Sequence, residues 1–281
     1  MIIENAFLKL PELLTSSFSH ADTYEATIVH FLSLALHMEL NSRNIPRPFE
    51  HIFTEKPYPT SHDFPRRLQA DLFVKLEGAV PTDGRMALYG TREQNWLEVK
   101  AFLGSTRKSN TPPKTENVGK IFKDILRLCL FPEELQGKIR QNGRYLIMVF
   151  SNEPRKSLAF SSGGRPRGWI QSMLMDGDSN IEIDLSSEQK SFRKAIGSGF
   201  IGNPDLRVEL KLRTLSFAPD SPTPGPVFWG YLVRIMAYAI KTSNLSIDYE
   251  DRPHDNWNAE RIDKLRSMQK YSLENMSLTS D

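Results

Sequence analysis

Two carboxylates and one lysine lie on two short apolar segments of this chain, and their types could support metal chemistry. Asp71 lies in the run Ala-Asp-Leu-Phe-Val, and Glu98 and Lys100 lie in Trp-Leu-Glu-Val-Lys-Ala-Phe. Side chains two residues apart on a strand share a face, so Glu98 and Lys100 are expected beside Trp96 and Phe102. Two acids brought together on paired strands favour a hard divalent cation such as Mg2+. Such a cation polarises a phosphoryl oxygen and activates a water, so the chemistry indicated is phosphodiester hydrolysis.

The Glu-x-Lys pattern alone is not specific, because the chain contains it three times. Glu188 begins a hydrophilic segment that predicts a solvated helix start, and Glu209 lies on a run of alternating charged and apolar residues typical of a half-exposed strand. A pairing of Asp184 with Glu209 is an alternative, although a helix is predicted where a hairpin would be needed. The structural alternative for Lys100 is a surface ion pair with a neighbouring carboxylate, which contributes little to stability.

The elements that would position these residues follow in a simple order. Residues 22–43 carry an apolar stripe at helical spacing, with Asp22 as a candidate N-cap. Residues 118–131 predict a second helix between strands at 95–103 and 144–150, and this β-α-β unit favours parallel pairing. The other predicted elements are strands at 51–55 and 68–77, helices at 168–175, 187–197 and 258–270, and antiparallel strands at 207–217 and 227–240.

The positive charge of the chain is concentrated in one region. The formal net charge over 281 residues is only +2, yet residues 101–170 hold 13 Lys or Arg against 5 Asp or Glu, a local excess of 8. A phosphate backbone could bind such a region directly downstream of Glu98. The candidate nucleic-acid-binding residues are Arg107, Lys108, Lys120, Arg165 and Arg167. A solvated basic surface without a ligand is the alternative interpretation.

Composition excludes several other classes of protein. With 39% hydrophobic and 25% charged residues, the chain is expected to be globular. The single cysteine, Cys129, has apolar neighbours and is expected to be a small buried hydrophobe. Six scattered histidines give no zinc-ligand spacing. No apolar run is long enough to span a bilayer and no secretory signal is visible, so no membrane association is predicted and the cytoplasm is the expected location.

Residues 22–150 resemble the PD-(D/E)XK, or restriction-endonuclease-like, nuclease superfamily. The resemblance depends on the first helix with Glu25, on Asp71, on Glu98-Val-Lys100, and on the helix and strand that follow. The proline of the family motif is absent, because Ala70 precedes Asp71. The resemblance implies an α/β fold with a restriction-endonuclease-like core, a central mixed β-sheet flanked by helices, and a C-terminal β-rich extension. The implied division is a catalytic core at 1–155 and an extension at 156–281, which could also form one continuous domain.

The resemblance also implies an activity and a role for each site residue. The activity would be that of a Mg2+-dependent DNA endonuclease, of type II restriction or phage-defence kind. Asp71 and Glu98 would bind Mg2+ together with the carbonyl of Val99, and Lys100 would orient or activate the water, helped by burial that lowers its pKa. Glu25 would be the acid of the first helix, with Glu39 as the alternative.

The implied partners follow from this activity. The substrate would be double-stranded DNA, and cutting both strands favours a homodimer. A cognate methyltransferase is a further candidate partner. The alternative function is a non-catalytic module that binds nucleic acid or a protein partner on a nuclease-like fold.

Overall fold

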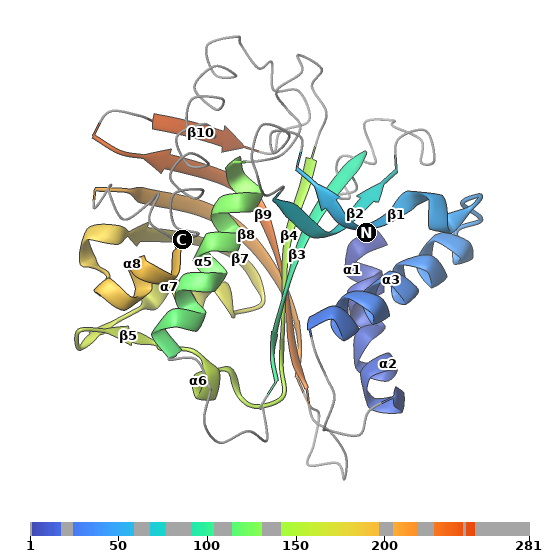
Figure 1. The fold of residues 1–281 in the computed structure, drawn as a ribbon, viewed down its shortest axis with the longest axis horizontal. Helices are drawn as coiled ribbons and strands as arrows, with labels where there is room; N and C mark the ends of the chain where they lie inside the picture. The colour runs from blue at the N-terminus through green and yellow to red at the C-terminus, as the bar shows by residue number, and fades with distance from the viewer. Residues whose placement is uncertain are drawn as a thin grey trace, which may run out of the picture.

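The chain forms an α/β fold in which one sheet separates two groups of helices (Figure 1). The computed structural model describes residues 2–17, 25–58, 68–76, 92–103, 114–130, 142–196, 205–218, 228–243 and 246–250. The helices are α1 (Ile2–Leu8), α2 (Leu10–Ser17), α3 (Glu25–Ser42), α5 (Lys114–Leu130), α6 (Pro154–Ser157), α7 (Gly168–Met173) and α8 (Lys190–Ile196), with 3-10 turns η1 (Pro48–His51) and η4 (Leu185–Ser187). The strands are β1 (Ile52–Pro57), β2 (Gln69–Lys75), β3 (Gln94–Phe102), β4 (Asn142–Phe150), β5 (Ser161–Ser162), β6 (Arg165–Pro166), β7 (Gly177–Asp184), β8 (Arg207–Phe217), β9 (Trp229–Lys241) and β10 (Ser246–Glu250).

Among the described residues the central sheet is mixed and contains eight strands. Its order is β1-β2-β3-β4-β9-β8-β7, and β10 also pairs with β9. Only β3 and β4 are parallel, with α5 as the connection between them, whereas the other described neighbours are antiparallel. The predicted mixed sheet with flanking helices is therefore confirmed, as are the parallel β-α-β unit and the antiparallel strands β8 and β9.

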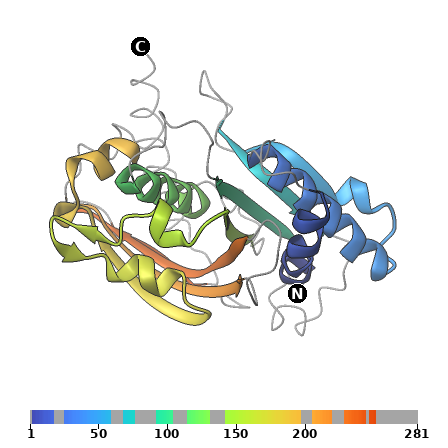
Figure 2. The ribbon, with the colours of Figure 1, turned by 90° about the horizontal axis from the view of Figure 1, so that it is seen from below.

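Each face of the sheet buries its own hydrophobic core (Figure 2). One core lies between the sheet and α5, α7 and α8, and it includes Trp96 of β3. The other lies between the sheet and α1, α2 and α3, and it includes Leu97 and Val99 of the same strand. This alternation confirms that Trp96 and Leu97 face opposite sides, and it directs Glu98 and Lys100 towards α5. Cys129 is fully buried in the α5 core, as predicted.

Several elements differ from those predicted. Helices α1 and α2 and strands β7 and β10 were not expected, and α8 begins at Lys190 after a 3-10 turn, three residues later than predicted. β7 is an outer strand whose apolar side chains are limited to Ile181 and Ile183, so its sequence carries little strand signal. The helix predicted at 258–270 lies outside the described residues. The predicted division at residue 155 falls between β4 and β9, which pair in one sheet.

Candidate active site

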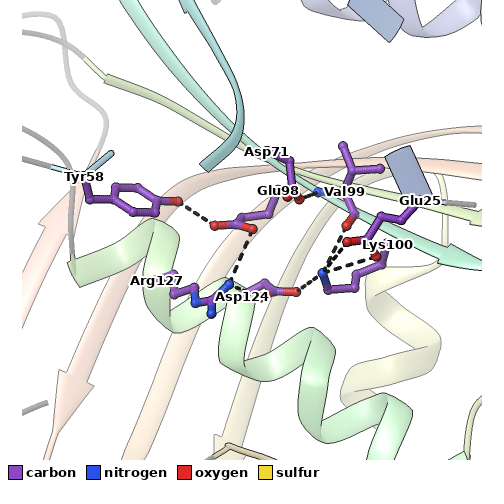
Figure 3. A network of polar contacts seen from close by, with 8 residues as sticks. All are labelled: Glu25, Tyr58, Asp71, Glu98, Val99, Lys100, Asp124 and Arg127. Carbon is purple, nitrogen blue, oxygen red and sulfur yellow. Dashed lines mark hydrogen bonds and ion pairs between the residues drawn. The ribbon is translucent and has the colours of Figure 1, made fainter. Parts of the chain in front are cut away.

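Strands β2 and β3 stop pairing where the two acids meet. Their antiparallel register runs from Lys75 and Gln94 to Leu72 and Leu97. At the next residue, the carboxylate Oδ2 of Asp71 accepts a hydrogen bond of 2.6 Å from the N–H of Val99. The side chain of Asp71 thus replaces a main-chain partner of β3 and brings its carboxylate beside the Glu98–Lys100 segment (Figure 3).

Lys100 lies at the meeting point of three elements. Its Nζ is 3.1 Å from the Val99 carbonyl oxygen, 3.2 Å from Oδ2 of Asp124 on α5, and 3.4 Å from each carboxylate oxygen of Glu25, the first residue of α3. Glu39, the alternative acid, is bound instead by Asn5, Lys9 and Arg43. The structure therefore places Glu25, and not Glu39, at the site.

Glu98 is completely buried, at 0% exposure, on the same face of β3. The hydroxyl of Tyr58, which directly follows β1, donates a hydrogen bond of 2.7 Å to Oε1 of Glu98. Arg127 of α5 lies 3.8 Å from Oε2 of Glu98 and 3.2 Å from Oδ1 of Asp124. Figure 3 shows that the carboxylate of Glu98 points towards Tyr58 and Arg127, whereas Asp71 points towards Val99.

The sequence interpretation missed Tyr58, Asp124 and Arg127. Asp124 and Arg127 are one helical turn apart on α5, and Asp124 is 2% exposed within the helix face that also carries Ile121 and Ile125. An acid within an apolar helical stripe is a usable signal, because buried acids require partners. Tyr58 gave no signal, since it stands alone in a Pro-rich passage.

Burial and close charges shift the pKa values of this cluster. Burial raises the pKa of Glu98 well above its usual range, and the neighbouring Asp124 raises it further, while Arg127 opposes the shift. Burial likewise raises the pKa values of Asp124 and Glu25, although Lys100 opposes both shifts. For Lys100 the prediction was wrong: burial favours the neutral amine, but the carboxylates of Asp124 and Glu25 outweigh it and raise the pKa. Lys100 is therefore a stable ammonium in the metal-free protein.

The raised acid pKa values predict an unusual dependence of stability on pH. Between the unfolded and folded pKa values of Glu98, Asp124 and Glu25, the folded state binds more protons than the unfolded state. Their stabilising contribution is thus present at low pH and is lost as the pH rises through the folded pKa values. We expect the unfolding free energy in EDTA to fall as the pH rises above about 4.5, the ordinary range of exposed carboxyl groups. Urea unfolding measures this, and Glu98→Gln should flatten the slope; a rising free energy above that pH would contradict the prediction.

The site is rich in carboxyl groups, which suits a divalent cation. The cluster brings together four carboxyl groups (Glu25, Asp71, Glu98, Asp124) and two cations in contact with them (Lys100, Arg127), and Lys123 of α5 lies close enough to Asp124 and Lys100 to act on their charges. Within the described ranges no three His, Cys, Asp or Glu side chains surround a single metal position. Oε2 of Glu98, however, is buried and makes no hydrogen bond to any described residue. The four carboxyl groups and this buried oxygen fit Mg2+, which proteins bind through one or two carboxylates.

The predicted nucleic-acid-binding residues differ in whether the structure describes them and in how exposed they are. Arg107 and Lys108 lie outside the described residues. Lys120 is partly exposed on α5 and forms an ion pair with Glu116, and Arg165 is exposed beside the Gly-Gly turn of the β5–β6 hairpin.

The structure contradicts the prediction that Arg167 contacts nucleic acid. It is only 2% exposed, and its guanidinium donates three hydrogen bonds to Glu188, which also accepts one from the indole of Trp169. Arg167 is thus held inside the fold and cannot reach a phosphate. Glu188 was expected to be solvated and is instead 7% exposed, because it is the partner of this arginine.

The alternative acid pair does not form a site. Asp184 lies opposite Arg207 in the β7–β8 register and forms an ion pair with it. Glu209 lies opposite Glu182 and forms an ion pair with Lys241 of β9. Both acids are therefore neutralised by cross-strand partners on an exposed surface, unlike Asp71 and Glu98.

No helix in the described ranges is both long and apolar enough to cross a bilayer. Comparison of the chain with protein-family models, with curated proteins and with solved structures gives no match.

Proposed function

We propose that this protein is a Mg2+-dependent DNA endonuclease of the PD-(D/E)XK superfamily. The observation that carries the proposal is that Asp71, Glu98, Lys100 and Glu25, from β2, β3 and α3, belong to one polar network, in which Asp71 is bound by the N–H of Val99 and Glu25 by Lys100. The order α3-β1-β2-β3-α5-β4, with an antiparallel β1-β2-β3 unit and a parallel β4, supports it because it matches the helix, three strands, helix and strand of the resemblance.

Each residue has a role that its position allows. Asp71, Glu98 and the Val99 carbonyl would hold the cation, whose chemistry is to polarise a phosphoryl oxygen and lower the pKa of water. Lys100 would act as an ammonium, because its pKa is raised, and would orient the attacking water or neutralise charge on a phosphate oxygen. Glu25 holds Lys100 from the α3 side through both carboxylate oxygens.

One observation favours the second candidate, a non-catalytic module that binds nucleic acid or a protein. Every predicted ligand group already accepts a hydrogen bond within the protein: Asp71 from Val99 N–H, Glu98 from Tyr58, and the Val99 carbonyl from Lys100. A site fixed in this way would not bind a metal. The four carboxyl groups of the cluster and the Oε2 of Glu98, which makes no hydrogen bond to a described residue, argue for the nuclease instead.

The wider biological role belongs to the same proposal. A restriction or phage-defence nuclease that cuts both strands would act as a homodimer with double-stranded DNA, in the cytoplasm, beside a methyltransferase that protects the host sites. Arg165 and Lys120 are the described basic candidates for phosphate contacts.

Incubation of the purified protein with plasmid and phage DNA, in Mg2+ or in EDTA, tests the proposal. We expect metal-dependent nicking or cutting by the natural protein and none by Asp71→Asn. Asp178→Asn is the matched control, because Asp178 forms an exposed ion pair with Arg213 on another part of the sheet. Salt-sensitive DNA binding without cutting would support the non-catalytic module, and absence of both would end the nucleic-acid interpretation.

A further inference from the structure

Helix α5 contributes a continuous chain of charges to the candidate site. Asp124 uses Oδ1 to bind Arg127, at 3.2 Å, and Oδ2 to contact Lys100, also at 3.2 Å. Arg127 in turn lies 3.8 Å from Glu98. The order Glu98–Arg127–Asp124–Lys100 thus begins and ends on one face of β3, at two residues of the proposed active site (Figure 3).

If this chain of charges only held α5 against β3, burying it would cost free energy without a matching benefit. The side chains of Asp124 and Glu98 are 3% and 1% exposed, and apolar residues of similar size would pack α5 on β3 without a desolvation penalty. The neighbouring positions Ile121, Ile125 and Leu128 are apolar and completely buried. Asp124 is the buried charged residue that interrupts this apolar pattern on α5, and both Asp124 and its partly buried partner Arg127 contact site residues.

The buried pair of Arg167 and Glu188 shows what a saturated structural ion pair looks like in this protein. There the arginine donates three hydrogen bonds at 2.7–3.1 Å, and Trp169 donates another to the same carboxylate. Arg127, by contrast, stays 3.8 Å from Glu98 and leaves Oε2 without a hydrogen bond among the described residues. Glu98 is therefore oriented by the Tyr58 hydroxyl and the nearby Arg127, while the acceptor capacity of its buried Oε2 is not used by any described residue.

We propose that Asp124 and Arg127 are positioning residues of the active site. Asp124 holds the Lys100 ammonium at the Val99 carbonyl, and Arg127, together with Tyr58, fixes the direction of the Glu98 carboxylate. The inference rests on the proposed nuclease function. It adds three residues outside the Glu-x-Lys pattern that orient the site residues: Asp124 and Arg127 of α5, and Tyr58, which follows β1. Residues that orient metal ligands commonly change metal affinity or activity by 10- to 100-fold when replaced.

Three variants of the full chain test the proposal: Asp124→Asn, Arg127→Met and Arg127→Lys. We expect Asp124→Asn to lower kcat for plasmid cleavage by about 100-fold with little change in KM for DNA, because Lys100 would lose its orientation. Arg127→Met should weaken Mn2+ binding, measured by calorimetry without DNA, by about tenfold. Arg127→Lys should recover most of that affinity, because it restores the charge beside Glu98.

The exposed pair of Asp178 and Arg213 supplies matched controls. Asp178→Asn and Arg213→Met make the same chemical changes as Asp124→Asn and Arg127→Met in an ion pair on β7 and β8, so cleavage and Mn2+ binding should match those of the natural protein. Thermal unfolding of each variant shows whether a loss of cleavage or Mn2+ binding comes from misfolding or from a misplaced Lys100 or Glu98 side chain. Should Asp124→Asn fail to fold, the contrast between Arg127→Met and Arg127→Lys decides.

Two failures can be told apart. If the natural protein cuts DNA and binds Mn2+, and the Asp124 and Arg127 variants do so equally well, the positioning role is wrong and the nuclease proposal stands. If the natural protein neither cuts DNA nor binds Mn2+, the proposed function is wrong, and the positioning role is then wrong as well.

Discussion

Replacement of Glu98 by Gln should lower the rate of DNA cleavage by a factor on the order of 10³ without lowering the unfolding free energy. The amide keeps the size of the side chain and can still accept the hydrogen bond from Tyr58. It removes the negative charge that would hold the cation. Burial already disfavours that charge, since the pKa of Glu98 is raised, so its loss relieves the fold at neutral pH.

The opposite signs of these two effects make the experiment diagnostic. Plasmid cleavage in Mg2+ measures the rate, and urea unfolding in EDTA near pH 8 measures the stability of natural and Glu98→Gln proteins. Glu209→Gln is a suitable control, because Glu209 lies on an exposed strand and pairs with Lys241. A variant that cuts DNA normally, or that loses stability and activity together, would show that Glu98 serves the fold and not the chemistry.

Sequence patterns anticipated the parts of the site that lie close together along the chain. Glu98 and Lys100 are two residues apart, and the period of a strand alone puts them on one face with Trp96. The neighbouring strand with Asp71 was predictable because its apolar run is compact and its partner is near. The order of helix, strands, helix and strand follows from the same short-range signals, and the structure has each of these elements.

Contacts between distant residues were not predictable in the same way. Arg167 looked like an exposed loop residue because its partner Glu188 is 21 residues away, and only the fold brings them together. The pKa of Lys100 was predicted from its aromatic neighbours on the strand, which would lower it. The structure adds Asp124 from α5 and Glu25 from α3, and these carboxylates reverse the direction of the shift. The local sequence indicates that a group is buried, but it does not show which charged side chains from other elements lie beside that group.

Replacement of Lys100 by Met is expected to damage both the fold and the activity. The side chain of Lys100 is 18% exposed and faces the carboxylates of Asp124 and Glu25. Without the ammonium, Arg127 is the only remaining cation among the residues of Figure 3, against four acids. Loss of one partner from a buried ion pair costs about 3 kcal/mol or more, because the other charge stays buried without compensation. Cleavage should fall by a factor on the order of 10², since Lys100 would no longer orient the water or neutralise charge.

The double variant Lys100→Met with Asp124→Asn separates these two losses. Removal of the Asp124 charge should restore a large part of the unfolding free energy at pH 8, because it removes the acid that Lys100 compensates. Activity should stay low, since no ammonium is returned to the site. The stability loss of Lys100→Met alone should also shrink as the pH falls, because the pKa values of Asp124 and Glu25 are already raised by burial and protonation removes the charges that Lys100 compensates. Recovery of cleavage in the double variant would mean that Lys100 only balances charge, and the catalytic part of its role would have to be given up.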